Sequence, residues 1–289
     1  MRNFAMIDGR TIWLPENRLT LHVVEAGPAD AEVVLLLHGW PTSSYLYRDV
    51  IPPLAQRYRV LALDLPGFGR SDKPLGASYG FRFFEACIEE LLSRLAIERL
   101  TLAVHDLGGP IGLYWAVEHP ERLERLILLN TVIYPEFSWA VKLFVAMTRI
   151  PGVREWLVSP SGLRWSMRFG VVNKERLTDE RLAPYLAPFE GPNARRVLLK
   201  TGSSLSIRGF ARIAAAFGSL NVPTRIVYGE RDRILPEVAE TMARVRRQMP
   251  HAEVSSFPDA AHFLQEDKGR ELGQLLARFL DDNPITDRR

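Results

Sequence analysis

The chain is poor in several features that mark particular classes of protein. Its 289 residues include one cysteine, Cys87, which excludes an internal disulfide and is typical of a reducing compartment. No apolar run is long enough to span a bilayer, and Met1–Gly9 carries no apolar segment of the kind found in signal peptides. The formal net charge of +3 is too small to indicate binding to nucleic acid. We therefore predict a cytoplasmic protein without nucleic-acid or membrane partners and without a metal or cofactor, and leave its oligomeric state open.

A further absence concerns the motif Gly-x-Ser-x-Gly, which places a nucleophilic serine at a turn between a strand and a helix. The nearest approach to it is Gly69-Arg70-Ser71-Asp72-Lys73, which lacks the final glycine. A serine esterase is therefore disfavoured.

A different residue occupies the corresponding place in this sequence. The stretch is Val104-His105-Asp106-Leu107-Gly108-Gly109-Pro110-Ile111-Gly112, preceded by the apolar run Leu100–Val104 and followed by a helical pattern. Small residues directly after the polar one let a helix and a strand approach each other closely. The stretch therefore predicts a sharp strand-to-helix turn with Asp106 at its apex.

Asp106 can be interpreted in two ways. A carboxylate raised above a sheet can attack a saturated carbon and form an alkyl ester, which water then cleaves. Aspartate is also a common N-cap, so the motif by itself does not separate a nucleophile from a residue that begins a helix.

Strand-like and helical segments alternate along the chain, which predicts an α/β fold with a mostly parallel eight-stranded sheet and helices on both faces. The predicted strands are Arg10–Pro15, Arg18–Ala26, Glu32–Leu37, Arg59–Leu63, Leu100–Val104, Leu123–Leu129, Thr224–Tyr228 and Glu253–Phe257. The first two are expected to pair as an antiparallel edge, and a helix is expected to end at about Gln56. His38, Asp64, Asp106 and Asn130 follow strands directly, and ligands of parallel sheets bind at these carboxyl ends.

Residues 131–222 interrupt the alternation with a helical segment that is rich in large apolar side chains. This segment holds 13 arginines and lysines against 6 acids, a net charge of +7, and the remainder of the chain carries −4. We predict a helical cap domain, 131–222, inserted into a core domain formed by 1–130 and 223–289. The basic excess favours a solvated outer face over an anion-binding site.

Two further residues complete a reactive set with Asp106. Asp232 and His262 both follow predicted strands, and the order nucleophile, acid, histidine is known in hydrolases of this fold class. Asp232 would orient His262, which would activate water for the second step. The rivals are less suitably placed, because His251 precedes a strand and Glu230 lies very close to a strand end.

Cleavage of an ester on Asp106 places negative charge on its carbonyl oxygen, which needs hydrogen-bond donors. The main-chain N–H groups of Trp40 and Leu107 are the candidates for this oxyanion hole. His38 is expected to brace the loop before Trp40 through hydrogen bonds.

Several segments resemble the aspartate-nucleophile branch of the α/β-hydrolase fold, which contains haloalkane dehalogenases and epoxide hydrolases. They are His38-Gly39-Trp40-Pro41-Thr42-Ser43-Ser44-Tyr45-Leu46-Tyr47-Arg48, Gly67-Phe68-Gly69-Arg70-Ser71-Asp72-Lys73-Pro74, Tyr185-Leu186-Ala187-Pro188-Phe189 and Ala261-His262-Phe263-Leu264-Gln265-Glu266. The resemblance extends over nearly the whole chain. It implies an α/β-hydrolase fold with a cap, an Asp106–His262–Asp232 triad, and a small apolar substrate that reacts with water.

The resemblance is incomplete where a leaving group would bind. Dehalogenases usually carry a tryptophan after the nucleophile, whose indole N–H binds the departing halide, whereas this chain has Leu107. Epoxide hydrolases protonate the leaving oxygen with two cap tyrosines. The candidates for binding substrate or leaving group are Trp40, His105, Tyr134, Trp139 and Tyr185.

These observations give three hypotheses. The first is a haloalkane dehalogenase-like hydrolase that prefers bromoalkanes, because bromide leaves more readily than chloride. The alternative is an epoxide hydrolase that forms vicinal diols, and the third hypothesis is a ligand-binding relative without catalytic activity.

Overall fold

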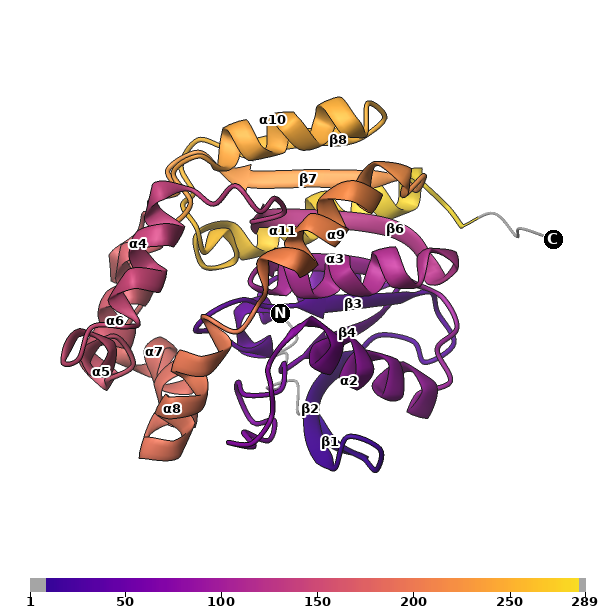
Figure 1. Ribbon diagram of the computed structural model, residues 1–289. Coiled ribbons are helices and arrows are strands. Elements are labelled where there is room, and N and C mark those ends of the chain that lie inside the picture. Colours follow the sequence, from indigo (N-terminus) through magenta and orange to yellow (C-terminus); the bar gives the residue numbers. More distant parts are fainter. Residues whose placement is uncertain (1–8, 286–289) are drawn as a thin grey trace.

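An eight-stranded sheet organises the computed structural model, which describes residues 9–285 (Figure 1). Its strand order is β1-β2-β4-β3-β5-β6-β7-β8, and β2 pairs antiparallel with both of its neighbours while all other pairs are parallel. The strands are β1 (Gly9–Leu14), β2 (Leu19–Ala26), β3 (Val33–Leu37), β4 (Arg59–Leu63), β5 (Leu100–Asp106), β6 (Leu123–Thr131), β7 (Thr224–Gly229) and β8 (Glu253–Phe257). The prediction of a mostly parallel sheet with an antiparallel edge is confirmed.

Side chains of successive strand residues contribute to two hydrophobic cores, because neighbouring residues of a strand point to opposite faces. On β5, Leu102 and Val104 belong to one core and Ala103 to the other. Helices α2 (Phe81–Arg94), α3 (Gly108–Glu118) and α10 (Val238–Gln248) cover the first face. Helices α1 (Ile51–Leu54) and α11 (Leu264–Asp282) cover the second. The sheet is therefore buried on both faces, as its continuous apolar strands predict.

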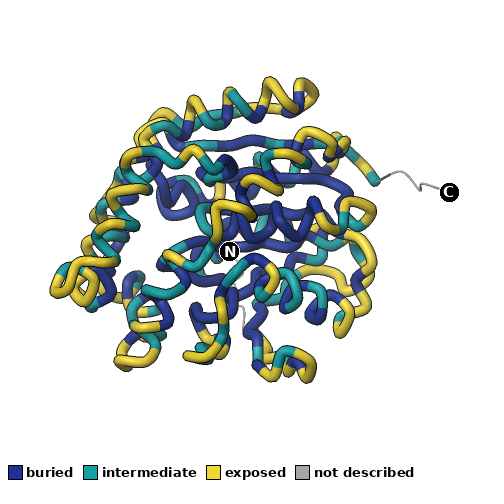
Figure 2. The backbone as a smooth tube through the Cα atoms, viewed as in Figure 1, coloured by how far each residue is buried: buried dark blue, intermediate teal, exposed yellow. Residues whose placement is uncertain are grey.

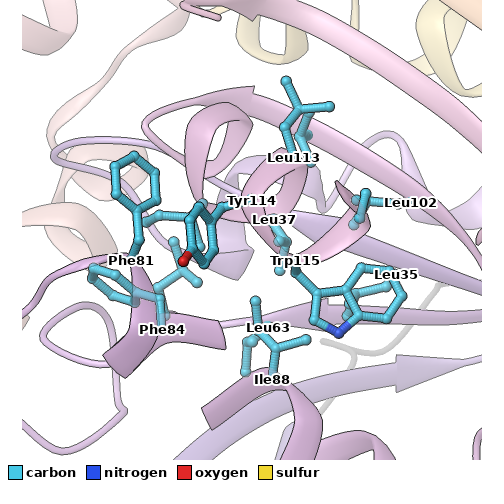
Figure 3. Close-up of a cluster of buried hydrophobic side chains, with 14 of the residues drawn as sticks. Leu35, Leu37, Leu63, Phe81, Phe84, Ile88, Leu102, Leu113, Tyr114 and Trp115 are labelled. Carbon is cyan, nitrogen blue, oxygen red and sulfur yellow. The ribbon is translucent and has the colours of Figure 1, made fainter. Parts of the chain in front are cut away.

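The larger core forms where α2 and α3 meet the sheet (Figure 3). The rings of Phe81 and Tyr114 stack with centroids 4.9 Å apart, and Trp115 is fully buried. Leucines of β3, β4 and β5, among them Leu35 and Leu102, pack in the same cluster. Each fully buried side chain of this size stabilises the fold by about 1.5–3 kcal/mol, so the core that carries the strand ends is held firmly.

The helix expected to end at about Gln56 forms as two short pieces. They are the 3₁₀ helix η1 (Ser44–Tyr47) and the four-residue α1, which contains Pro52 and Pro53. Two consecutive prolines remove two N–H donors from the hydrogen-bond ladder, which is tolerated only near the start of a helix. The other short 3₁₀ helices are η2 (Pro120–Arg122), η3 (Lys174–Arg176), η4 (Ala187–Phe189) and η5 (Phe217–Ser219).

The segment 131–222 is helical beyond the end of β6. It contains α4 (Trp139–Met147), α5 (Val153–Leu157), α6 (Pro160–Phe169), α7 (Asp179–Leu186), α8 (Pro192–Thr201) and α9 (Ile207–Ala216). Figure 1 shows α4 to α8 together at the left of the view, beyond the ends of the strands. The last helix, α9, packs on the core instead, since the ring of Phe210 lies 5.4 Å from that of Phe81 of α2. The division into a core and a cap at 131 and 222 stays a prediction.

No helix of the described range 9–285 combines the length and the apolar composition that crossing a bilayer requires. The prediction of a cytoplasmic location therefore stays a prediction.

Candidate functional site

The turn that follows β5 has the geometry of a nucleophile elbow. Asp106 ends the strand with a φ of +48°, and α3 begins two residues later at Gly108. A Cβ at Gly108 would lie 2.4 Å from the carbonyl oxygen of His38, and one at Gly109 would lie 1.6 Å from Oγ1 of Thr131. Strand and helix therefore approach so closely that only glycine fits. The N-cap of α3 is Leu107, so the interpretation of Asp106 as an N-cap is wrong.

The two carboxylate oxygens of Asp106 face different partners. Oδ1 accepts a hydrogen bond of 2.7 Å from the main-chain N–H of Trp40, one of the two predicted oxyanion-hole donors. Oδ2 lies 3.4 Å from Nε2 of His262. A Cβ at Gly39 would lie 2.2 Å from Oδ1, so this glycine leaves the space that the carboxylate occupies. The arrangement holds one oxygen on the main chain and turns the other toward an imidazole.

His262 and Asp232 form a buried pair behind the carboxylate. Nδ1 of His262 lies 2.8 Å from Oδ2 of Asp232, and neither side chain is exposed. Oδ1 of Asp232 accepts hydrogen bonds of 2.8 Å from the N–H groups of Ile234 and Leu235. The loop after β7 thus fixes the carboxylate, and the carboxylate fixes the imidazole.

Asn130, at the end of β6, belongs to the same network, a role that the sequence reasoning missed. Its side-chain amide donates to Oδ2 of Asp232 at 2.7 Å, and its side-chain oxygen accepts from the N–H of Gly229 at 3.0 Å. It also has a positive φ of +30°. Its position directly at a strand end was the signal that could have revealed this role.

Mutual charge sets the protonation of the three groups. Burial alone would lower the pKa of His262, but the charges and hydrogen bonds of Asp232 and Asp106 raise it to about 10. Burial alone would raise the pKa of each carboxyl, yet the hydrogen bond and charge of His262 bring both below the ordinary value. At neutral pH the site is therefore a carboxylate, an imidazolium and a second carboxylate.

This array has a consequence for a covalent intermediate. Conversion of Asp106 into an uncharged ester removes one of the two carboxylates that raise the pKa of His262. In such an ester the pKa of His262 would be lower, and the imidazole could then act as a base.

The rival residues are engaged elsewhere. Nε2 of His251 lies 2.9 Å from the carbonyl oxygen of Val222, and Glu230 accepts a hydrogen bond of 2.6 Å from Ser256. His38 bridges its loop as expected. Its Nδ1 lies 2.9 Å from the carbonyl oxygen of Gly39, and its Nε2 accepts from the N–H of Leu65 at 3.1 Å.

The predicted leaving-group donors already have hydrogen-bond partners. The indole N–H of Trp40 donates to the carbonyl oxygen of Leu198 in α8 at 3.1 Å. The hydroxyl of Tyr134 donates to Gln248 at 2.8 Å, and that of Tyr185 donates to Glu266. None of these three groups is free to turn toward a ligand without giving up its present partner.

His105 and Trp139, the other candidates for binding, differ sharply in exposure. Nε2 of His105 lies 2.9 Å from the main-chain oxygen of His262, and burial together with the charge of His262 lowers its pKa to about 4. His105 is therefore neutral and supports the loop that carries His262. Trp139, at the start of α4, is 63% exposed.

A cavity of about 490 Å³ lies between the chain that follows β6 and helix α10. Among the residues that line it are Tyr134, Trp139, Leu235 and Thr131. Oγ1 of Thr131 donates to the main-chain oxygen of Asp106 at 2.7 Å. A residue of the cavity wall is therefore hydrogen-bonded directly to the elbow residue.

Comparisons with known proteins identify the family of the chain. Residues 32–269 match the family described as the alpha/beta hydrolase fold. The chain is 31% identical to a haloalkane dehalogenase of Psychrobacter cryohalolentis, over 93% of this chain and 90% of the relative. It is 34% identical to a haloalkane dehalogenase of Mycobacterium marinum, over 89% and 88%. It is also 31% identical to a cis-3-alkyl-4-alkyloxetan-2-one decarboxylase of Xanthomonas campestris pv. campestris, over 92% and 94%.

Solved structures give the same result for the fold. An ancestral haloalkane dehalogenase superimposes with a TM-score of 0.81 at 26% identity, covering 94% of this chain and 98% of that one. The haloalkane dehalogenase DbeA from Bradyrhizobium elkani superimposes with a TM-score of 0.84 at 23% identity, covering 95% and 98%.

Proposed function

The chain belongs to the α/β-hydrolase fold family, in its haloalkane dehalogenase-like branch, and we propose that it hydrolyses carbon–halogen bonds through a covalent ester on Asp106. The observation that supports the proposal best is the alignment of three side chains. Oδ2 of Asp106 lies 3.4 Å from Nε2 of His262, whose Nδ1 lies 2.8 Å from Asp232. A protein that only binds a ligand has no need of all three groups in this order.

In the first step Oδ2 of Asp106 attacks the carbon that bears the halogen. The carbon–halogen bond breaks, halide leaves with the bonding pair, and an alkyl ester forms. The lowered pKa of Asp106 keeps the nucleophile ionised, and the N–H of Trp40 holds Oδ1 so that Oδ2 is the attacking atom.

In the second step His262 takes a proton from water, and the resulting hydroxide attacks Cγ of Asp106. Oδ1 then carries the negative charge, which the N–H of Trp40, at 2.7 Å, and that of Leu107 stabilise. Collapse of the intermediate breaks the bond between Cγ and the ester oxygen, which takes the proton of the added hydroxyl group and leaves as the alcohol. The carboxylate of Asp106 is thereby restored, and His262 keeps the proton that it took from water. Asp232 stabilises the imidazolium formed on the way.

The hydrogen-bond donors available to the leaving group determine which substrates react fastest. Leu107 offers no side-chain donor, and the indole N–H of Trp40 is bound to Leu198. A hydrogen bond to a charged group contributes about 1.5–3 kcal/mol, so an unsupported halide must be a good leaving group. Bromoalkanes are therefore the favoured halogenated substrates, with chloroalkanes much slower.

Epoxide hydrolysis is the alternative, and the hydroxyls of Tyr134 and Tyr185 are its candidate acids. Both would first have to leave their bonds to Gln248 and Glu266, which makes this alternative less favoured.

A four-membered lactone is a second candidate substrate, because its leaving group is a carboxylate that stays attached and needs neither an acid nor a halide site. The relative from Xanthomonas campestris, described as an oxetan-2-one decarboxylase, favours this candidate. Asp106 would attack C4 and break the bond between C4 and the ring oxygen, giving an ester and a free carboxylate. Loss of CO₂ would then break the bond from C3 to the carboxyl carbon, form the C3–C4 double bond and expel Asp106.

One set of assays separates these reactions. The purified protein is incubated with 1-bromobutane, 1-chlorobutane, styrene oxide and a cis-dialkyl oxetan-2-one, and halide, diol and CO₂ are measured. Release of bromide supports the leading proposal. Diol alone overturns it in favour of the epoxide hydrolase, and CO₂ with alkene alone overturns it in favour of the decarboxylase.

Trapping the ester tests the covalent step directly. In His262→Gln the second step is blocked, so intact-mass spectrometry after exposure to 1-bromobutane should show one added butyl group. His251→Gln is the matched control, because its histidine bonds Val222 away from the pair, and it should turn over without an adduct. Absence of an adduct with every substrate would favour a ligand-binding protein.

A further inference from the structure

The outer surface of α4 is apolar and has no covering element in the described part of the chain. The helix Trp139–Met147 contains one charged side chain, Lys142, yet none of its residues is buried. Trp139 and Leu143 are 63% and 50% exposed, and Ile150, in the following turn, is 49% exposed. Within α4 the exposed positions are 139, 142, 143 and 146, which have the spacing of one helix face, so Trp139 and Leu143 lie on a single outward face.

A second exposed aromatic group lies on the next two helices. Trp156 of α5 and Trp165 of α6 are 44% and 49% exposed, with ring centroids 5.7 Å apart. The ring of Trp165 stacks on that of Phe169 at 4.9 Å. Figure 2 shows exposed residues (yellow) alternating with intermediate ones (teal) along this edge of the molecule, where Figure 1 places α4, α5 and α6. We call the exposed side chains of residues 139–168 the cap face.

The cap face is strongly basic. It holds five basic side chains and one acid, Glu155, which pairs with Arg154. The basic side chains are Lys142, Arg149, Arg154, Arg164 and Arg168. Arg164 pairs with Asp179 of α7 (Asp179–Leu186). Within residues 9–285, Lys142, Arg149 and Arg168 make no ion pair. The exposed apolar side chains are therefore flanked by positive charge that is free to interact with a partner.

Tryptophan and aliphatic side chains beside lysine and arginine are the composition of surfaces that lie in a membrane interface. Two copies of the chain would bring like charges together if they met through this face, since a two-fold contact pairs the same patch with itself. We propose that the cap face binds the surface of a bilayer that contains anionic lipids, with Trp139, Leu143 and Trp165 at the level of the headgroups. This proposal departs from the expectation of no membrane partner, which was based on the lack of an apolar run long enough to span a bilayer. Peripheral binding needs no such run.

Vesicle sedimentation with the full chain tests the proposal. Vesicles of phosphatidylcholine with an equal share of phosphatidylglycerol should sediment the protein at low salt, and vesicles of phosphatidylcholine alone should not. Binding should weaken as salt is raised, because each basic residue near an anionic surface strengthens partitioning about fivefold. Equal binding to both vesicles, or no binding to either, would overturn the proposal.

Matched triple variants locate the binding surface. Lys142→Gln, Arg149→Gln and Arg168→Gln together should lower the partition coefficient roughly 100-fold. The control is Arg82→Gln, Arg94→Gln and Arg270→Gln, which removes the same charge from exposed positions of α2 and α11. An equal loss in the control would show a general effect of net charge and overturn the proposal.

The apolar contribution is tested separately. Leu143→Ser with Trp165→Ser should reduce binding at least tenfold while circular dichroism shows that the variant is still folded, because both side chains are about half exposed. A second outcome would overturn the proposal: the unmodified protein forms a dimer in solution and does not bind vesicles, and the double variant is a monomer. The cap face would then be the contact with a second copy of the chain. Hydrolytic activity is not used in any of these readouts, so they stand apart from the proposed function.

Discussion

The strand ends and the outer cap helices use polar and aromatic side chains in opposite ways. At the strand ends His262 and Asp232 are wholly buried, and Asp232 accepts hydrogen bonds from two N–H groups and from Asn130. On the cap face Trp139 and Trp165 are about half exposed or more, and α4 has no buried residue. Reactive groups are thus held by many partners, while the cap face keeps its side chains available for contact with the surroundings.

Some of the contacts between the cap and the core involve the loops that carry the site residues. The indole of Trp40 donates to Leu198 of the cap, and the N–H of Phe263 donates to Gly170 at 2.8 Å. Asp267 accepts from the N–H of Val172 at 3.1 Å and from that of Ala261 at 2.9 Å. The loop that carries His262 is therefore tied to the cap, and the cap can place a substrate relative to the imidazole.

Removal of the proposed nucleophile should give the largest effect. Asp106→Asn should lower kcat for bromoalkane hydrolysis by about 10⁴-fold or more, because the amide cannot form the ester. Asp179→Asn removes an exposed cap carboxylate and should leave kcat unchanged. Halide release measures kcat of both variants. Equal losses of kcat would contradict the expectation that only the carboxylate at the strand end takes part in the reaction.

The acid of the pair comes next. Asp232→Asn should lower kcat by about 10³–10⁴-fold, since the imidazolium loses its partner charge and the imidazole its orientation. Glu230→Gln, two residues away and bonded to Ser256, should retain activity. Loss of activity in Glu230→Gln alone would assign the acid to Glu230.

Substitution of a leucine should affect the stability of the protein differently in the two regions. Leu102 is fully buried, so Leu102→Ala should leave a cavity in the core and lower the free energy of unfolding by about 2–5 kcal/mol. Leu143→Ala on the cap face should change it by less than about 0.5 kcal/mol. Urea denaturation gives both values, and a large loss for Leu143→Ala would mean that the cap face is packed in solution.

Glycines give a finer comparison. A Cβ at Gly39 would lie 2.2 Å from Oδ1 of Asp106, so Gly39→Ala should displace the carboxylate and lower kcat by about 10²-fold. Gly191 in the cap has no neighbour within 4 Å of such a Cβ, and Gly191→Ala should be silent. Unchanged kcat in Gly39→Ala would argue against Oδ1 as the oxygen held by Trp40.

The pH dependence of the reaction should show the smallest effect, and it should depend on groups of the core and not on those of the cap face. Ester formation requires ionised Asp106, whose pKa is lowered, and should not vary with pH above the acidic range. Ester hydrolysis requires neutral His262, whose pKa is raised, and should accelerate about tenfold per pH unit up to the pKa in the ester. Single-turnover kinetics separates the steps. Lys142→Gln should leave both profiles unchanged, and a hydrolysis step that slows as pH rises would contradict the role of His262.

Much of this architecture was predictable because it depends on local pattern. Apolar runs such as Val60–Leu63 predicted strands with buried faces, and β4 has the predicted bounds, Arg59–Leu63. Asp106, Asp232 and His262 were identifiable because each follows a strand, and the ends of parallel strands meet at one edge of a sheet. The strand-end positions, the order of the three residues along the chain and the resemblance to a known family together predicted that these side chains come together.

The sequence by itself determined the class of fold and the set of reactive groups, since periodicity and strand-end position are properties of neighbouring residues. Only the tertiary structure decided which donors stay free. The indole N–H of Trp40 donates to the carbonyl oxygen of Leu198, 158 residues away in the sequence. The hydroxyl of Tyr134 donates to Gln248, 114 residues away. Tertiary structure also decided which aromatic side chains of the cap face outward. A hydrogen bond or a covered face depends on the partner that folding brings near, and no local pattern contains that partner.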